Sequence, residues 1–231
     1  ARRWSLSLPD AVHTLADLQR GRERTLTLLH DAEPTDDALY FFRLALLHED
    51  MHREAWIYMA QNLGFAPGVD SIEPQPVPDD RGEIGIEGGL CSIGSPSEGF
   101  AFDNELGVQE MALSGYRIDA APVNWARYLE FIAAGGYEEP RLWSKDGWSW
   151  RKRASPGWPR YLERAEDGSW WRSRFGERVP LDAALPAMHL SHHEAVAWCR
   201  WAGRRLPGEA EWEHAAVTAA ERGEPFHWGQ V

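Results

Sequence analysis

One stretch of the chain, Asp36–Gly64, combines helical periodicity with side chains that bind metals. Its apolar residues recur at a spacing that gives one wide apolar face, and the glycine at its end is a common helix stop. His48 and His52 lie four residues apart, and at about 3.6 residues per turn this spacing places both imidazoles on one face of a helix. The stretch therefore predicts a long helix that presents a histidine pair.

The histidine pair has several interpretations on its residues alone. The letters HEDMH match HExxH, the pattern in which zinc proteases use two histidines as ligands and the glutamate as general base. Charged residues crowd the motif here, and the HxxGxxH continuation of one class of these proteases fails at Ala55 and Tyr58. A zinc hydrolase, a pair without a metal and a different metal centre remain the alternatives.

The residues on either side of this stretch predict another helix and a linker. Ser7 offers a helix cap, Pro9 suits a first helical turn, and leucines at helical spacing continue to His30. Residues 65–82 contain four prolines and no periodicity, which is typical of a linker. The sequence therefore predicts a domain boundary in this segment.

The chain beyond the linker has a different composition. It holds nearly all of the 13 tryptophans, among many of the 15 prolines and 21 glycines, which favours a loop-rich domain held by aromatic packing. Short apolar pieces predict one or two hairpin strands within 83–95 and further strands within 108–123. No periodic signal is present in 137–185. Helices are predicted over three further segments: 124–134, 191–203 and 205–216.

Charge and hydropathy exclude several classes of partner. The formal net charge of -12 disfavours a nucleic acid, since a phosphate backbone would be repelled and no basic stripe interleaved with aromatics is present. No apolar run approaches the ~18 residues of a membrane span, and the first residues lack the apolar stretch of a signal peptide. Cys91 and Cys199 form neither a CxxC nor a CxH spacing. We therefore expect a cytoplasmic protein with two reduced thiols and no membrane or nucleic-acid partner.

Other polar side chains have structural explanations. His192 and His193 are adjacent at a helix start and so diverge by about 100°, which favours capping or surface roles for them and for His189 over a second metal site. Cys199 is expected to be a small core residue between two tryptophans. Three acids are expected to stabilise the start of the last helix: Glu209, Glu211 and Glu213.

Four tryptophans in the segment without periodicity are expected mainly in the core and in loops. One or two of them can line a cleft and stack on a substrate ring. These tryptophans are Trp143, Trp148, Trp150 and Trp158.

The motifs together resemble one enzyme family over almost the whole chain, from Arg3 to Gly229. HEDMHREA on a bundle helix is followed by a linker and then by PVNWARYLEFIAAGGY, WSKDGWSWR, MHLSHHEAVAWCRWAGRRLPGEAEWEHAA and FHWG. This order resembles the non-haem iron enzymes of ergothioneine and selenoneine biosynthesis. The resemblance implies a multi-domain fold, with an N-terminal DinB-like four-helix bundle followed by an α+β, C-type-lectin-like domain of the formylglycine-generating-enzyme type.

The resemblance also implies a metal centre. Three histidines hold Fe(II) in that family, and His48 and His52 match two of them. Three neutral imidazoles on one face would leave positions open for O2, the cosubstrate, and for a sulfur or selenium donor. The third ligand is expected upstream of Ala1, and the nearby His13 and His30 are expected at the surface.

The expected reaction joins the imidazole C2 carbon of hercynine to a chalcogen donor. Met51 replaces a glutamine that is common in the sulfur-inserting enzymes, and HEDMH with FAFDNE and the tryptophan-rich insert resembles the selenoneine synthase branch, whose donor is a selenosugar. The alternative is sulfoxide synthesis with cysteine or γ-glutamylcysteine. Glu49 and Asp50 could orient a metal ligand by accepting its other N–H.

The expected domains follow from these motifs. Residues 1–64 are assigned to part of the helical bundle, 65–82 to the linker and 83–231 to the lectin-like domain. Both ends appear within expected folded segments, so we expect a fragment whose second domain continues beyond residue 231. The sequence leaves the oligomeric state open.

Overall fold

The computed structural model describes residues 7–68, 74–78, 82–154 and 157–227. The chain divides into two compact units, and the first comprises Ala1–Ala55 with Gly94–Gly107. The second comprises Trp56–Ile93 with Val108–Val231. The predicted linker, 65–82, lies in the second unit, with 69–73 and 79–81 outside the described residues, and its role as a domain boundary stays a prediction.

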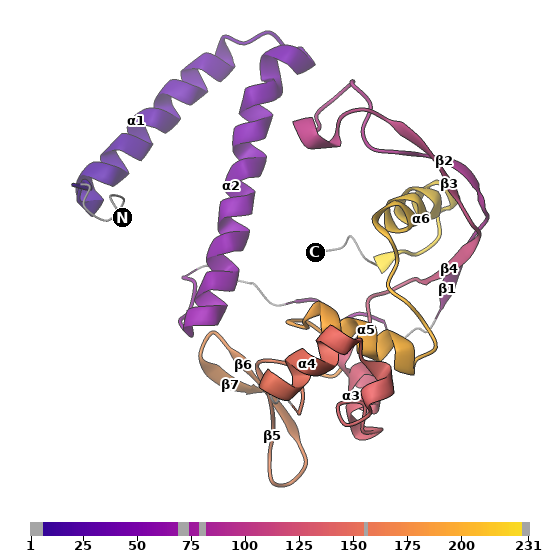
Figure 1. The fold of residues 1–231 in the computed structure, drawn as a ribbon. Helices are drawn as coiled ribbons and strands as arrows, with labels where there is room; N and C mark the ends of the chain where they lie inside the picture. Colours follow the sequence, from indigo (N-terminus) through magenta and orange to yellow (C-terminus); the bar gives the residue numbers. More distant parts are fainter. Residues whose placement is uncertain (1–6, 69–73, 79–81, 155–156, 228–231) are drawn as a thin grey trace. The chain divides into compact units, whose positions relative to one another are not determined.

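Two helices, α1 (Ala11–His30) and α2 (Asp36–Leu63), precede the strands (Figure 1). The cap of α1 is Asp10 rather than the predicted Ser7, because the Asp10 carboxylate accepts the His13 backbone N–H at 2.8 Å. Thr35 caps α2, since its Oγ1 accepts the Ala38 N–H at 3.3 Å. Gly64 follows α2 with a φ of 74°, so the predicted stop of this helix is confirmed. The four-helix bundle stays a prediction.

The first unit also contains a loop from the later part of the chain. Residues 94–107, with the 3₁₀ turn η2 (Asp103–Glu105), return to the start of α2. Asp36 Oδ2 accepts the Gly99 N–H at 3.0 Å, and the rings of Tyr40 and Phe100 lie 5.4 Å apart. This loop therefore packs on the histidine-bearing helix near its N-terminal end.

Two strand pairs open the second unit. β1 (Glu83–Ile86) pairs with β4 (Tyr116–Asp119), and β2 (Gly89–Ile93) pairs with β3 (Gln109–Leu113), both antiparallel. The strands predicted within 83–95 are present, but they do not form a hairpin with each other, because β1 pairs with β4 and β2 pairs with β3. A Cβ on Gly88 would lie 2.7 Å from the backbone nitrogen of Gly115, so the connection between β3 and β4 passes too close for a side chain there.

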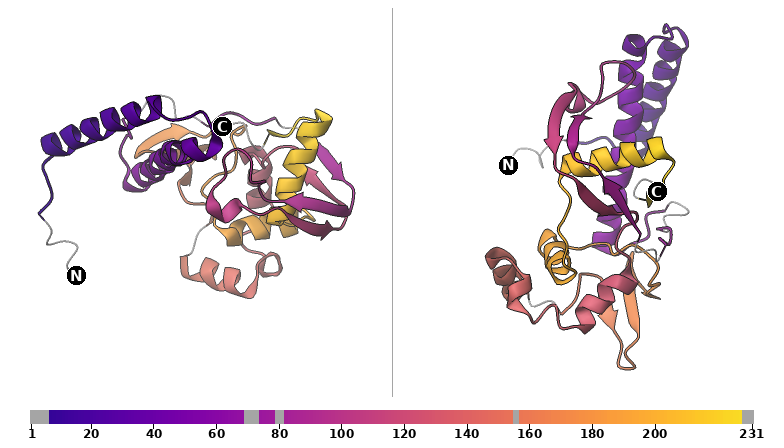
Figure 2. Two further views of the ribbon diagram at one scale, coloured as in Figure 1. Left: turned by 90° about the horizontal axis from the view of Figure 1, so that it is seen from above. Right: turned by 90° about the vertical axis from the view of Figure 1, so that its right-hand side faces the viewer.

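One helix covers these two strand pairs, and several short elements lie in residues 140–180. Helix α6 (Glu209–Arg222) packs on β1 and β2 (Figures 1 and 2). Residues 137–185, which show no periodic signal, contain short elements of only a few residues each, too few for a period to be recognised. They are η3 (Pro140–Leu142), α4 (Lys145–Ala154), β5 (Leu162–Arg164), β6 (Trp170–Arg174) and β7 (Glu177–Pro180), with β5, β6 and β7 forming one antiparallel sheet.

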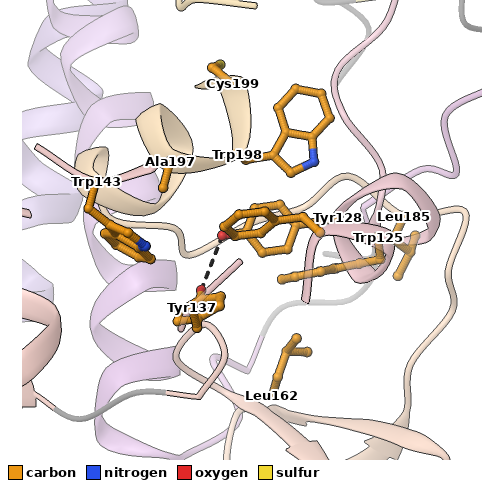
Figure 3. Close-up of a cluster of buried hydrophobic side chains, with 10 residues drawn as sticks. Trp125, Tyr128, Tyr137, Trp143, Leu162, Leu185, Ala197, Trp198 and Cys199 are labelled. Atoms are coloured by element: carbon orange, nitrogen blue, oxygen red, sulfur yellow. Dashed lines mark hydrogen bonds between the residues drawn. The ribbon is translucent and has the colours of Figure 1, made fainter. Parts of the chain in front are cut away.

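The main core lies between α3 (Trp125–Ala133) and α5 (His192–Trp201), both of which were predicted (Figure 3). Tyr128 and Tyr137 are fully buried, with their hydroxyl oxygens 3.2 Å apart. Tyr137 also donates to Glu194 Oε1 at 2.6 Å. Burial raises the pKa of both tyrosines, which keeps the hydroxyls neutral and able to donate.

The helix caps of the second unit agree with the sequence. The Ser191 hydroxyl accepts the Glu194 N–H at 3.3 Å, and Glu194 Oε2 accepts the Ser191 N–H at 2.8 Å. At α6, Glu211 accepts the Gly208 N–H and pairs with Arg205, and the Arg205 hydrogen bond lowers the pKa of Glu211 to about 2. Within the described residues, no helix combines the length and apolar character needed to cross a membrane.

The end of α2 is fixed to the β6–β7 hairpin by one side chain. Gln61 is only 8% exposed; its Nε2 donates to the Ser173 carbonyl at 3.0 Å and its Oε1 accepts the Phe175 N–H at 2.8 Å. Phe175 has a φ of 48° and Gly176 a φ of 84°, so the hairpin turn holds a phenylalanine in the left-handed region. Gln61 therefore stabilises a turn whose first residue is unfavourable by itself.

Replacing Gln61 with Ala is expected to destabilise this hairpin by about 1–2 kcal/mol, because a carbonyl and an N–H both lose their partner. The amide of Phe175 should then exchange its hydrogen faster, measured by exchange mass spectrometry or NMR. Gln61→Glu keeps the acceptor for Phe175 but loses the donor to Ser173, so exchange at Phe175 should be intermediate. Unchanged protection of Phe175 in the Ala variant would show that the turn does not depend on Gln61.

Candidate functional site

The two predicted metal ligands lie side by side on α2. The ring centroids of His48 and His52 are 4.4 Å apart with an interplanar angle of 58°, and both side chains are exposed. The four-residue spacing produces this geometry, since each turn of the helix brings the second ring above the first. The pair could supply two imidazole ligands to one metal ion.

The neighbouring acids differ in their contacts. Glu49 Oε1 lies 3.8 Å from His52 Nδ1, which is a loose ion pair, and both side chains are mostly exposed. Asp50 Oδ1 instead lies 3.5 Å from Arg53 Nη1. Of the two acids proposed to orient a ligand, Glu49 is the one near a histidine ring.

Within the described residues, no group of three or more His, Cys, Asp or Glu side chains could hold a metal ion. His13 and His30 are exposed on α1, and His13 Nδ1 lies 2.7 Å from Asp10 as part of the helix cap. The residues present therefore fit two positions of a three-histidine centre, and a third ligand would come from residues outside those described.

A cleft of about 720 Å³ lies wholly within the second unit. It is lined by the last turns of α2, by α4, by the loop before β5 and by the start of α5. Its walls include two tryptophans predicted to be core or cleft residues, Trp150 and Trp158. Its other charged or aromatic residues are Tyr58, Arg160, Tyr161, His189 and Glu194.

The polar side of the cleft combines a cation with two strained residues. Arg160 Nη2 donates to Asn62 Oδ1 at 2.6 Å, and the guanidinium carbon lies 4.6 Å from the centroid of the Tyr161 ring. Tyr161 has a φ of 70° and His189 a φ of 61°, and their rings meet edge to face at 4.9 Å. Non-glycine residues in this region are uncommon and cluster at functional sites.

The surroundings of His189 favour the neutral form of its imidazole. Burial first, and then the positive charges of Arg160 and Arg172, lower the pKa of this imidazole. A neutral imidazole offers one donor and one acceptor to a ligand in the cleft. His192 is exposed, in agreement with the predicted surface role, whereas His193 is half-buried and its ring lies 5.7 Å from that of Trp150.

A second cavity, of about 320 Å³, is lined by charged side chains that form ion pairs. Asp119 Oδ2 lies 2.8 Å from Arg127 Nη2 and Asp119 Oδ1 lies 2.9 Å from Arg204 Nη1. Arg204 also lies 2.6 Å from Glu83. Cys199 lines this cavity as a buried free thiol whose pKa is raised by burial, which disfavours the reactive thiolate.

Residues 69–231 match the model of the sulfatase-modifying factor enzyme 1-like domain, the FGE-sulfatase family. This match covers more than half of the chain. The chain belongs to this family. The FGE-sulfatase domain accounts for the strands β1 to β7, the core of Figure 3 and the aromatic residues 150–161 of the cleft.

Relatives of this FGE-sulfatase chain include two mycobacterial proteins. It is 35% identical over 213 residues to the hercynine oxygenase of Mycolicibacterium smegmatis, covering 87% of this chain and 48% of that protein. It is 32% identical over 207 residues to the hercynine oxygenase of Mycobacterium tuberculosis, covering 86% and 48%. The chain thus spans about half the length of these curated relatives.

A further relative belongs to another part of the FGE-sulfatase family. The formylglycine-generating enzyme of Thermomonospora curvata is 30% identical over 178 residues, covering 71% of this chain and 58% of that enzyme. The share of this chain matched by the hercynine oxygenases is larger, and it exceeds what residues 69–231 alone contain. Their similarity therefore extends from the FGE-sulfatase domain into the segment that carries α1 and α2.

Sequence reasoning found the histidine pair but missed most of the cleft. Arg160, Tyr161 and His189 belong to no motif, and the chain brings them together only through the fold. The tryptophan-rich composition was the one available signal, because Trp150 and Trp158 were considered as cleft residues. Positive φ at Tyr161 and His189 has no sequence signature when the residue is neither Gly nor Asn.

Proposed function

We propose that this chain is the part of a non-haem iron enzyme that holds Fe(II) and modifies hercynine with O2 as cosubstrate. The reaction would form a carbon–selenium bond between the imidazole C2 carbon of hercynine and a selenosugar donor. The alternative is carbon–sulfur bond formation with cysteine or γ-glutamylcysteine. Either reaction is an oxidation, because the C2–H bond and the Se–H or S–H bond of the donor are replaced by one C–Se or C–S bond, which releases two protons and two electrons. Formation of the C–Se bond alone would reduce O2 to hydrogen peroxide. In sulfoxide synthesis the sulfur also gains one oxygen atom, so O2 accepts four electrons and its second oxygen atom leaves as water.

One observation supports hercynine as the substrate more than any other. The similarity to the two hercynine oxygenases covers 86–87% of the chain and includes the helical segment, whereas similarity to the formylglycine-generating enzymes covers 58–71% of it. The helical segment carries HEDMH, so the similarity includes the residues proposed to bind the metal.

His48 and His52 would hold the iron through ring nitrogens. Their adjacent rings fit two neighbouring positions of one coordination sphere, and their exposure leaves space for a third ligand and for substrates. Bound Fe(II) would supply the activation of O2. Glu49, 3.8 Å from His52 Nδ1, could fix the orientation of this ring by accepting its N–H after a small rotation.

The proposed domain organisation places residues 1–64 in a DinB-like four-helix bundle, 65–82 in a linker and 83–231 in the FGE-type domain. The exposed apolar residues of α1 and α2 support further helices packed against them, because such residues at helical spacing normally face a core. They include Val12, Leu15, Leu18, Leu26, Leu29, Phe41, Leu46 and Leu47. The lectin-like description of the second part belongs to the same proposal.

The selenium donor is proposed from the residues around the histidine pair. Met51 is 53% exposed next to His52 and carries a polarizable thioether where the sulfur-inserting enzymes have an amide. A polarizable thioether suits contact with a soft selenium atom better than an amide does.

The test uses the full-length protein and oxygen consumption. Fe(II)-loaded protein is mixed with hercynine and a selenosugar in an oxygen electrode, and O2 uptake is expected only when both substrates are present. Omitting hercynine is the matched control, because it leaves metal and donor unchanged. Peptidase activity of a zinc-loaded protein without hercynine-dependent O2 uptake would overturn the proposal in favour of the HExxH zinc hydrolase.

A further inference from the structure

The cleft of about 720 Å³ in the second unit is a formed site that the proposed metal chemistry does not use. Its volume lies in the range of small-molecule sites, and all of its lining residues belong to one compact unit. Aromatic side chains from separate parts of the chain line it: Tyr58 at the end of α2, Trp150 on α4, Trp158 and Tyr161 before β5, and His189 before α5. Aromatic side chains that meet from separate segments, together with a few polar groups, are typical of ligand-binding sites.

The aromatic walls of the cleft are held in fixed positions. Trp150 stacks on the buried Trp143 with centroids 6.2 Å apart and an angle of 28°. Trp158 meets Trp170 edge to face at 5.5 Å, and its Nε1 donates to the Leu162 carbonyl at 3.0 Å. Each indole is thus anchored on the core side, while it also lines the cleft, where a planar ring can stack.

The charge available to a ligand is positive. The guanidinium of Arg160 is oriented by Asn62 and by the Tyr161 ring, and it has five N–H donors for one described hydrogen bond. Burial first, and then the charges of Arg160 and Arg172, lower the pKa of His189, so both guanidinium groups act on this side of the cleft. Guanidinium groups bind carboxylates through two parallel hydrogen bonds.

The one carboxylate that lines the cleft is already used. Glu194 is 3% exposed, with Oε1 bound to the Tyr137 hydroxyl and Oε2 bound to the Ser191 N–H. Its charge therefore serves the core and the helix cap. This arrangement favours an acidic ligand over an amine.

We propose that this cleft binds a small carboxylic acid that carries a planar aromatic or heteroaromatic ring. The ring packs against Trp150 and Trp158, which both line the cleft, and the carboxylate pairs with Arg160 on the side of the cleft that also holds His189. The strained backbones of Tyr161 and His189 hold these two side chains in place for the ligand. The ligand class includes hercynine, so for that ligand the inference deepens the proposed function and rests on it, whereas the binding step itself needs neither Fe(II) nor O2.

The test is calorimetric titration of the metal-free chain with indole-3-acetate, compared with the neutral indole-3-acetamide and the cationic tryptamine. The acid should bind about tenfold more tightly than the amide, since only the acid forms a charge-assisted pair with Arg160. Arg160→Gln should weaken binding of the acid by about tenfold and leave the amide within about twofold. Arg160→Lys, which keeps the charge, should restore part of the affinity for the acid.

Arg178→Gln is the matched control. Arg178 also lies over an aromatic ring, 4.0 Å from the centroid of Trp171, and pairs with Glu163, but it does not line the cleft. The Arg178→Gln substitution removes the same charge from the same unit, but away from the cleft. The affinity of this variant for indole-3-acetate should therefore stay within about twofold of that of the unchanged protein. Equal weakening by Arg178→Gln, tighter binding of tryptamine, or no binding of the acid up to about 10 mM would each overturn the proposal. Since no arm requires turnover, failure here is separate from failure of the proposed oxidation.

Discussion

Replacing His48 or His52 with Ala is expected to lower Fe(II) affinity by more than about a hundredfold, because each change removes one of three proposed imidazole ligands. Hercynine-dependent O2 uptake should disappear in the same variants. The measurement is the iron content of the full-length protein after anaerobic loading and desalting. The helix should persist, since both side chains are exposed and alanine favours helices.

His30→Ala is the control for the histidine variants. His30 is exposed on α1 and stands outside the HEDMH motif, so its loss should leave iron content and O2 uptake unchanged. Full iron occupancy in His48→Ala would contradict the assignment of this pair. Loss of iron in His30→Ala would instead make His30 a candidate for the third ligand.

Replacing Asp119 with Ala is expected to destabilise the second unit by about 3–5 kcal/mol, because it leaves the buried guanidinium of Arg127 without its anionic partner. The side chain of Asp119 is 10% exposed and that of Arg127 is 7% exposed, with 2.8 Å between the paired atoms. Arg204 also loses a contact at 2.9 Å but keeps Glu83. Urea unfolding followed by tryptophan fluorescence measures this unit, since all the described tryptophans lie in it.

A surface ion pair supplies the comparison for Asp119. Glu163 and Arg178 lie 3.0 Å apart, but their side chains are 56% and 47% exposed, so Glu163→Ala should cost about 1 kcal/mol or less. Asp119→Asn should be less damaging than Asp119→Ala, because the amide oxygen still accepts one hydrogen bond from Arg127. Similar midpoints for Asp119→Ala and Glu163→Ala would show that the buried pair is not the main support of this region.

Local signals in the sequence predicted the helices well. A cap at Thr35, a stop at Gly64 and a capping box at Ser191 act within a few residues, so their chemistry can be read from adjacent letters. The i, i+4 spacing of His48 and His52 fixed their mutual position for the same reason. α4 lacked such a signal, because it has only ten residues and a highly polar sequence.

Features that depend on distant residues could not be predicted. β1 pairs with β4 rather than with β2, the next strand in the sequence. This pairing depends on residues about 30 positions away, so no local pattern shows it. Arg160 and His189 meet across the cleft because the start of α5 packs beside the loop before β5. Neither residue belongs to a sequence motif, so the cleft could be recognised only from the packing of the fold.

Product analysis of a donor competition tests the central claim most directly. The Fe(II)-loaded full-length protein is given O2, hercynine and equal amounts of a selenosugar, cysteine and γ-glutamylcysteine, and the products are identified by mass. We predict a hercynine derivative that carries selenium at C2. A product that carries sulfur would overturn the selenium assignment in favour of the thiol alternative. Hercynine recovered unchanged with every donor, from protein that retains its iron, would contradict the proposed function.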